Sequence, residues 1–383
     1  MPQLRLGKGG ALWRRRASPA FCDLRAVLLN TQAPLHNPTQ YVLGAGCESD
    51  MAQRAISLAP STLVRRRRAH ASSCRAQLAA VHETQAHSTS VLALASHADP
   101  RLGVFVASSG ADGGLAIWRC ASGGPLQLHA RHKVTGAPLF SLLSNAGWLL
   151  AGTAAKDVVR TRWSDLVGDD ASPCIERACA NHTGWVRALS ADGHCVFSVG
   201  CNFVRCWDAE TLAPLGQERL FSGDVAALAS VGGVTYSGGA DGSLRAYDAD
   251  AARRPAVRLR QSVERAHSDR LETLTACASM LVSGGRDGAL RVWQPSGLTL
   301  KHNVLDAHGA GSLVQCLAAC GDGVLLSGGS DGCVRRWQCT PGSGVLKPAG
   351  VSAASSPVRA LLNLADARCV VSGHQDGTLR VWL

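Results

Sequence analysis

One short phrase recurs seven times between residue 105 and the end of the chain, and this repetition restricts the fold more than any other feature of the sequence. Its clearest copies read SGGADGSLRAY, SGGRDGALRVW, SGGSDGCVRRW and SGHQDGTLRVW, and they end at Tyr247, Trp293, Trp337 and Trp382. Successive copies are 40 to 46 residues apart. A period of this length indicates one repeated structural unit rather than two or three unrelated domains.

Each copy of the phrase predicts a β-hairpin. An apolar run such as residues 280–282 is typical of a buried strand, Asp-Gly is typical of a tight turn, and the alternation Leu-Arg-Val-Trp is typical of a returning strand. Upstream of several copies, as at His87, His182 and His267, a histidine precedes the start of another apolar strand. With the segment that joins one Trp to the next His, each period contains four strands.

This arrangement resembles the WD40-repeat family over about residues 75–383. The resemblance implies an all-β fold, a seven-bladed β-propeller of four-stranded antiparallel blades, in which each repeat supplies the outer strand of one blade and the inner three strands of the next. The sequence departs from the family pattern, because only Trp207-Asp208 has the full Trp-Asp dipeptide. Repeats two, four and seven lack the His, and repeat three carries Asn202 in a shorter turn, so we expect these four to be held less tightly.

The seventh blade needs an outer strand from elsewhere, because the chain stops one residue after Trp382. The segment at about residues 75–85 matches the approach to later repeats, since VHETQAH resembles SVERAH. Pairing of this segment with the last strand would close the ring and remove an exposed sheet edge. We therefore expect a propeller domain at 73–383, closed by the strand at about 75–85, and a separate Arg-rich segment at 1–72.

The positive charge of the chain is concentrated in that first segment. Residues 1–72 have a net charge of +8, whereas residues 73–383 have only +3. The segment has arginine runs at 14–16 and 65–68 and no sustained periodicity, so we expect a disordered tail or a targeting segment. The second run leaves an organelle address, a nuclear address and a nucleic-acid patch open. We expect an intracellular protein, cytoplasmic or nuclear, with organelle targeting as the alternative.

The repeats also contain the residue types of a hydrolase triad. In the family that the sequence resembles, these residues form a structural hydrogen-bond relay, in which Asp binds His and His is linked through Ser to the Trp indole. A nucleophile needs a free hydroxyl beside an oxyanion hole, and several copies of a catalytic site in one chain would be unusual, so we expect structure rather than catalysis. The predicted relay residues are His87, Ser108, Asp112, Trp118, His267, Ser283, Asp287, Trp293, His308, Ser327, Asp331, Trp337, Ser372, Asp376 and Trp382.

The resemblance further implies a protein-binding top face, where the loops before the innermost strands and the turns of the Asp phrase converge. Trp185 differs from the structural tryptophans because it does not lie at the end of a repeated phrase. Trp and Arg are frequent interface hot spots. Either Trp185 packs against the loop of its own blade or it contacts a partner. Arg270 and Arg286, near Asp224, either pair with their neighbours or bind an acidic motif. The predicted binding residues are Ser90, Lys156, Trp185, Asp224, Arg270, Arg286 and Gln375.

The remaining features favour a binding protein over an enzyme. The 15 cysteines include no CxxC pair, and no phosphate loop or metal-ligand cluster is present in the sequence, so we expect neither a metal nor a cofactor. No apolar run reaches the roughly 18 to 20 residues that cross a bilayer. The expected function is a non-enzymatic scaffold or adaptor that binds protein partners as a monomeric propeller within a complex. The alternative is an RNA-associated or ribonucleoprotein factor that uses the basic tail.

Overall fold

The structure, a computed structural model, describes most of residues 80–383. All of these residues belong to one of the two units into which the chain divides, Glu48–Leu383. The basic segment at 1–72 and its predicted disorder lie outside the described residues. The described ranges are 80–121, 124–168, 173–178, 182–219, 223–249, 257–321 and 323–383.

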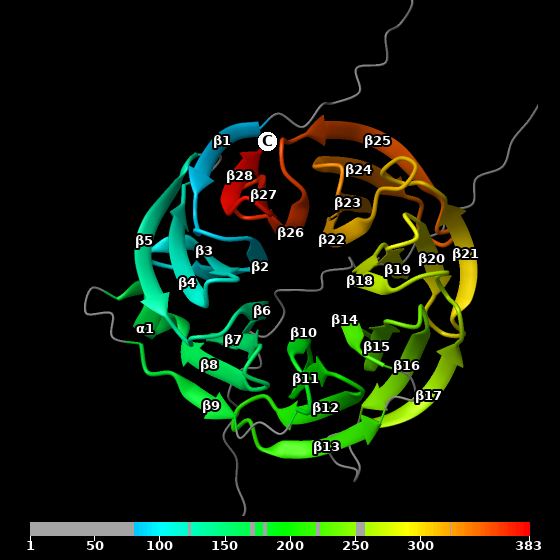
Figure 1. The fold of residues 1–383 in the computed structure, drawn as a ribbon, viewed down its shortest axis with the longest axis horizontal. Coiled ribbons are helices and arrows are strands. Elements are labelled where there is room, and N and C mark those ends of the chain that lie inside the picture. The colour runs from blue at the N-terminus through cyan, green and yellow to red at the C-terminus, as the bar shows by residue number, and fades with distance from the viewer. Residues whose placement is uncertain are drawn as a thin grey trace, which may run out of the picture. The chain divides into compact units, whose positions relative to one another are not determined.

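Seven four-stranded antiparallel sheets stand around a common centre as the blades of a propeller, which confirms the predicted fold class (Figure 1). Blade 1 consists of β2 (Val91–Asp99), β3 (Gly103–Gly110), β4 (Gly114–Cys120) and β5 (Leu126–Lys133). Blade 2 consists of β6 (Leu139–Asn145), β7 (Trp148–Thr153), β8 (Val158–Arg162) and β9 (Glu176–Ala178). Blade 3 consists of β10 (Val186–Asp192), β11 (Cys195–Gly200), β12 (Phe203–Asp208) and β13 (Pro214–Arg219).

The other four blades have the same strand order. Blade 4 consists of β14 (Val225–Val231), β15 (Val234–Gly239), β16 (Leu244–Ala249) and β17 (Val257–Val263). Blade 5 consists of β18 (Leu271–Cys277), β19 (Met280–Gly285), β20 (Leu290–Gln294) and β21 (Thr299–Val304). Blade 6 consists of β22 (Val314–Cys320), β23 (Val324–Gly329), β24 (Cys333–Cys339) and β25 (Leu346–Ala353). Blade 7 consists of β26 (Val358–Leu364), β27 (Cys369–His374), β28 (Thr378–Trp382) and β1 (Ala80–Gln85).

The ring is closed by β1, which comes from the N-terminal side of the repeats and pairs antiparallel with β28 at the C-terminus (Figure 1). Gln85 lies opposite Thr378, and Glu83 forms an ion pair of 2.8 Å with Arg380. The backbone N–H of His87 also donates to the carbonyl of Gly377. Strands from the two ends of the repeat region therefore share one sheet. The expected closing segment begins at about residue 75, and its residues 75–79 lie outside the described part.

The core consists of apolar layers between neighbouring blades. The described residues contain one buried apolar cluster for each of the seven interfaces; the cluster between blades 5 and 6, for example, joins Val282 and Val292 to Val314 and Trp337. The first Gly of the SGG phrase is required by this packing. A Cβ added at Gly284 would lie 2.5 Å from the side chain of Val314 in the next blade. The recurring glycine thus allows each blade to approach the next one closely.

Blade 2 differs from the predicted hairpin. Trp163 was expected to end a returning strand, but β8 ends at Arg162 and Trp163 begins a five-residue helix, α1 (Trp163–Val167). The indole still lies in the core, where it stacks on His97 of blade 1 and donates a hydrogen bond to Ser144. The tryptophan fills the interface between the blades from a different backbone conformation, and the outer strand β9 that follows has only three residues.

Candidate functional site

The predicted relay has all four of its members in blades 1, 5 and 6, and blade 5 illustrates it. Nδ1 of His267 donates to Oδ1 of Asp287 over 2.9 Å, and Nε2 accepts from the hydroxyl of Ser283 over 2.7 Å. The indole N–H of Trp293 donates to the same hydroxyl oxygen over 2.9 Å. Equivalent bonds join His87, Asp112, Ser108 and Trp118 in blade 1, and His308, Asp331, Ser327 and Trp337 in blade 6.

The electrostatics of this relay favour a neutral histidine. Burial lowers the pKa of His267, and the hydrogen bond and charge of Asp287 oppose this only in part. Burial raises the pKa of Asp287, but hydrogen bonds from His267 and Arg291 outweigh it and hold that pKa well below its usual range. Ser283 is fully buried, and its hydroxyl is bonded to two side chains. It therefore belongs to the packing and does not have the exposure that a nucleophile needs.

Blade 7 builds its relay from a residue that sequence reasoning missed. Ser372 accepts from the indole of Trp382 over 2.7 Å and pairs with His374, which lies on the same strand. Asp376, which was predicted to be part of the relay, instead accepts hydrogen bonds from the backbone and hydroxyl of Thr378. The signal was His374 in SGHQDG, at a position where the clearest other copies have Gly. In blade 5 a Cβ at the equivalent Gly285 would clash with the upstream relay histidine, which blade 7 lacks.

Blade 3 has an incomplete relay. His182 and the indole of Trp207 both bond the hydroxyl of Ser198 over 2.7 Å. Nδ1 of His182 is buried and has no hydrogen-bond partner in the described part of the chain. Burial, together with the charge of Arg205, lowers the pKa of His182 to about 4. A histidine without its carboxylate is therefore held neutral over a wide range of pH.

The predicted binding residues lie at the end of the ring where the inner strands begin, which we call the top face. Ser90, Trp185, Asp224 and Arg270 directly precede β2, β10, β14 and β18. Lys156, Arg286 and Gln375 lie in the turns between the second and third strands of blades 2, 5 and 7.

Hydrogen bonds to backbone carbonyls join residues of these two sets. Within blade 5, the N–H of Arg286 donates to the carbonyl of Arg270 over 2.9 Å. Between blades, the hydroxyl of Ser90 donates to the carbonyl of Gln375 over 3.0 Å. The loop before an inner strand therefore lies against a turn of the Asp phrase, as the resemblance implied, although the binding role of the residues stays a prediction.

The top face has an aromatic side, on blades 2 and 3. Trp185 is 49% exposed and stacks on Phe140 of β6, with ring centroids 5.3 Å apart. The guanidinium of Arg187 lies 5.1 Å from the centroid of Trp185 and 5.4 Å from that of Phe140. The tryptophan thus contacts the neighbouring blade and remains half exposed, instead of being buried in the loop of its own blade. A rigid aromatic surface next to a cation can contact apolar side chains.

The top face also has a charged side, on blades 3 to 5. Arg187 faces Asp224 at 3.9 Å, and both Arg270 and Arg286 form ion pairs with Glu272. Three guanidinium groups therefore converge on two carboxylates. Burial lowers the pKa of Arg187, and the nearby charge of Arg270 lowers it further. Nη2 of the largely buried Arg270 has no hydrogen-bond partner among the described residues.

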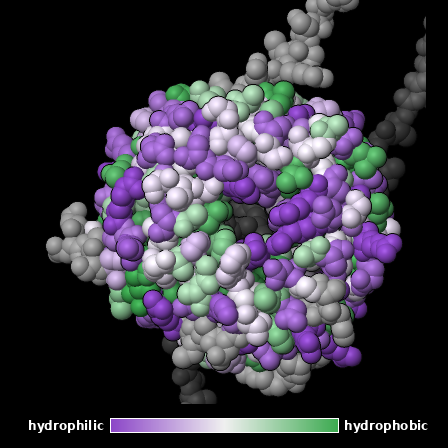
Figure 2. Space-filling model, in the orientation of Figure 1, coloured by the Kyte–Doolittle hydropathy of each residue, from purple (hydrophilic) through white to green (hydrophobic). Residues whose placement is uncertain are grey.

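Sequence reasoning missed three of these residues, Phe140, Arg187 and Glu272. Each is the second residue of an inner strand and follows a fully buried first residue. Pairing in these strands shifts register just after the first residue, which leaves the second without a place in the regular ladder. The signal was present as an aromatic or charged residue directly after the first apolar residue of each strand. Figure 2 shows the hydrophilic side of the central opening over β18 and β19, and more apolar residues over β2 and β6.

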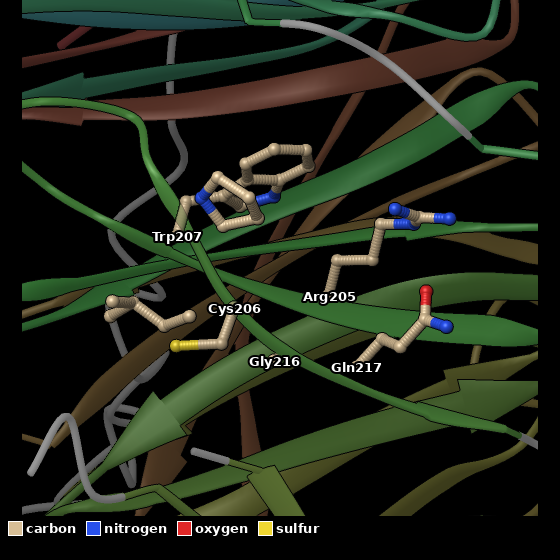
Figure 3. A pocket seen from close by; sticks show the side chains of 7 residues that line it. Arg205, Cys206, Trp207, Gly216 and Gln217 are labelled. Carbon is tan, nitrogen blue, oxygen red and sulfur yellow. The ribbon is translucent and has the colours of Figure 1, made fainter. Parts of the chain in front are cut away.

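A pocket of about 270 Å³ lies elsewhere, between β12 and β13 of blade 3 (Figure 3). Pairing of these strands shifts register between Cys206 and Trp207, which separates the strands locally. Arg205 and Gln217 face each other in the ladder and extend to the same side in Figure 3. The indole of Trp207, which forms part of the wall, is bonded to Ser198 in the core. We therefore interpret the pocket as a consequence of the bulge.

The described residues contain no cluster of three or more His, Cys, Asp and Glu side chains arranged to bind a metal ion. In this part of the chain no helix has the length and hydrophobicity to cross a membrane.

Comparisons with known proteins agree with this architecture. The family model described as WD domain, G-beta repeat matches residues 79–119, 300–338 and 348–382. Each matched segment begins at the outer strand of one blade and ends in the third strand of the next, as at β1 to β4. This is the offset between repeat and blade that the family resemblance implied. None of the curated proteins matches this chain in sequence.

Solved structures share the fold at low sequence identity. The crystal structure of the RRP9 WD40 repeats is 16% identical, with a TM-score of 0.67, and covers 80% of this chain and 99% of that chain. The structure of U3-55K is 16% identical, with a TM-score of 0.66, and covers 79% and 98%. The WD40 β-propeller domain of Doa1 is 16% identical, with a TM-score of 0.65, and covers 80% and 97%. At this identity the likeness shows the fold alone. Given the matching repeats, the relays and the closed seven-bladed ring, this chain is a member of the WD40-repeat family.

Proposed function

We propose that this protein is a non-enzymatic scaffold that binds a segment of a partner protein on its top face. The observation that carries the proposal is the half-exposed indole of Trp185, stacked on Phe140 beside Arg187. Exposing a tryptophan to water is unfavourable, whereas a partner side chain placed on it would bury apolar area. Tryptophan is also among the residue types that dominate binding energy at interfaces.

The charged side of the same face supports a partner with an acidic residue. Arg187, Arg270 and Arg286 lie close to one another, and the side chain of Arg286 is 48% exposed. A carboxylate supplied by a partner would accept from the exposed guanidinium of Arg286 and offset the repulsion among the three positive charges. We therefore infer a segment in which an acidic residue lies close to an apolar one, so that one binds the arginines while the other packs on Trp185.

The proposal that the protein is not an enzyme is supported by the relays. Their serine hydroxyls are buried, and each is shared between an indole and a histidine. The same set recurs around the ring, as expected for a group that stabilises each blade.

The test is affinity purification with the full-length protein as bait, followed by quantitative mass spectrometry. We expect Trp185→Ala and Arg270→Glu each to reduce recovery of one and the same set of partners by about tenfold or more, because loss of a hot-spot residue costs at least about 2 kcal/mol. A synthetic peptide from the recovered partner that combines acidic and apolar residues should bind directly and lose affinity when its acidic residue becomes Gln.

Leu128→Ala is the matched control, because Leu128 is also 49% exposed but lies on the outer strand β5. It should leave partner recovery unchanged, and all variants should retain the melting temperature of the wild type within a few degrees. If the Trp185 and Arg270 variants recovered the same partners as the wild type, the binding site would lie elsewhere.

The alternative of an RNA-associated factor rests on the basic segment at 1–72, which lies outside the described residues. It stays a prediction, as does the compartment. Binding through that segment would fall steeply with salt and would be lost when residues 1–72 are deleted.

A further inference from the structure

Two buried thiols meet at the interface between the last blade and the first. Cys120 is the final residue of β4 in blade 1, and Cys369 is the first residue of β27 in blade 7. Their sulfur atoms are 3.9 Å apart, and both belong to the apolar cluster of this interface. A disulfide would require the sulfurs, now 3.9 Å apart, to approach by about 2 Å.

A second pair occupies the equivalent place between blades 5 and 6. Cys339 ends β24 two residues after Trp337, as Cys120 ends β4 two residues after Trp118. Its partner Cys277 lies at the hairpin between the first two strands of blade 5, as Cys369 does in blade 7. Cys277 and Cys339 also share a hydrogen bond. The repeat geometry therefore brings a third-strand thiol against the hairpin of the preceding blade in two places.

The two pairs differ in their distance from solvent. Cys120 is 6% exposed, whereas the equivalent Cys339 is completely buried. The other members of the two pairs, Cys369 and Cys277, are each 3% exposed. A small oxidant can therefore reach the pair at the ring closure more easily than the pair between blades 5 and 6.

We propose that Cys120 and Cys369 form a disulfide modification site, at which a hydroperoxide oxidant links blades 1 and 7 covalently. The sulfur of Cys120 attacks one peroxide oxygen, the O–O bond breaks and hydroxide leaves with the former Cys120 proton as water, so that Cys120 becomes a sulfenic acid. The sulfur of Cys369 then attacks that sulfur, the S–O bond breaks and the second hydroxide leaves with the Cys369 proton. Two thiols lose two electrons and two protons, and hydrogen peroxide becomes two water molecules.

The greater exposure of Cys120 makes it the attacking group, because the oxidant must reach a sulfur atom and Cys120 is 6% exposed whereas Cys369 is 3% exposed. The two sulfurs share a hydrogen bond in which either thiol can donate. When Cys369 donates, the bond lowers the pKa of Cys120 and raises that of Cys369. The thiolate is the reactive form of cysteine, so the first oxidation is expected at Cys120. Cys369 then lies beside it as the resolving thiol.

The bond would act beside the place where the ring closes. Blade 7 is held together by noncovalent pairing of β1 with β28, and the disulfide would join residues 249 positions apart across the adjoining interface. Because cross-links that close long loops restrict the unfolded chain most, the oxidised protein should be more resistant to unfolding than the reduced protein.

The test uses the full-length protein, treated with hydrogen peroxide and then digested without reduction. Mass spectrometry should detect peptides of Cys120 and Cys369 joined with the loss of two hydrogen atoms, and this bond should form before any bond between Cys277 and Cys339. The melting temperature should rise by about 5 to 10 °C and return to its starting value after reduction.

Cys369→Ala should abolish both the linked peptides and the rise in melting temperature and leave a sulfenic acid at Cys120. Cys316→Ala is the matched control, because Cys316 is buried in an inner strand beside backbone carbonyls, and it should leave the cross-link intact. The proposal is overturned if a peroxide dose that oxidises the exposed Cys174 leaves both thiols of the wild type reduced. Because the readout is a covalent bond, the result does not depend on whether a partner binds the top face.

Discussion

Blades 3 and 5 contain the same histidine, serine and tryptophan arrangement, but only blade 5 completes it with a carboxylate. In blade 5 the chain runs from Asp287 through His267 and Ser283 to the indole of Trp293. In blade 3 the turn between β11 and β12 consists only of Cys201 and Asn202, and the histidine has no acid to bind. The propeller therefore tolerates the loss of the carboxylate, provided that the histidine stays neutral.

The comparison also separates stability from function. Blade 5 has the complete relay as well as the charged side of the top face, whereas blade 3 combines an incomplete relay with the exposed Trp185. The histidine, serine and tryptophan of the relay are buried, whereas Trp185 and the side chain of Arg286 are about half exposed, so each set can vary while the other is kept. A substitution in the relay should change the free energy of unfolding, and a substitution on the top face should change partner binding.

The largest expected difference follows from removing the histidine. We expect His267→Ala to lower the free energy of unfolding by about 3 to 5 kcal/mol, because it leaves a cavity and removes a partner from both a buried carboxylate and a hydroxyl. His182→Ala should lower it by less, about 2 to 3 kcal/mol, because it leaves a similar cavity but removes a partner from the Ser198 hydroxyl alone. Urea unfolding of both variants measures the difference. An equal or larger loss for His182→Ala would show that the carboxylate adds nothing.

The pH dependence should sharpen the same comparison. The folded protein keeps His182 neutral down to about pH 4, whereas the unfolded chain binds the proton near pH 6.5, so stability is complete above pH 6.5 and is lost as pH falls. Between pH 7 and pH 5 this group alone should remove about 2 kcal/mol of stability.

Thermal unfolding of His182→Gln at pH 7 and pH 5 should therefore show a smaller loss of stability on acidification than thermal unfolding of the wild type. His267→Gln is the comparison variant. It should reduce the dependence of stability on pH by less than His182→Gln does, because Asp287 raises the pKa of His267 against the effect of burial. If both variants flattened the profile equally, the missing acid in blade 3 would not be the cause.

The smallest expected effect compares two complete relays. The side chain of Asp287 is 8% exposed and 2.9 Å from its histidine, whereas that of Asp112 in blade 1 is 27% exposed and 3.3 Å from His87. Asp287→Asn should therefore lower the free energy of unfolding by about 1 to 2 kcal/mol. Asp112→Asn should lower it by less than about 1 kcal/mol, since exposed hydrogen bonds contribute less to stability. Chemical unfolding of the two variants tests the order, and a larger loss in blade 1 would contradict it.

The number of blades was predictable because it depends on local patterns that repeat, and the relay partners were predictable from the family resemblance that these patterns carry. Each hairpin has its own turn and its own alternation of apolar residues, so a period of about 40 to 46 residues was enough to count the blades. Trp163 and His374 were harder to interpret. Their roles depend on the space that a neighbouring segment leaves unfilled. In blade 7, for example, no upstream histidine is present, and His374 bonds the relay serine instead.

The contacts on the top face could not be predicted from local patterns either. The positions of its loops followed from the repeat. The stacking of Trp185 on Phe140, however, joins two blades, and so does the convergence of Arg187, Arg270 and Glu272. Their distances depend on how the blades pack, which no local pattern encodes.

The amino-acid sequence by itself determined the number of blades and the strand order within each blade, because turn preferences, strand alternation and the repeat period act within one unit. The hydrogen bonds of the complete relays followed from the resemblance to the WD40-repeat family. Only the tertiary structure decided which side chains from neighbouring blades meet. The aromatic and charged sides of the top face and the thiol pair at the ring closure exist because closing the ring brings together residues that lie far apart in the chain.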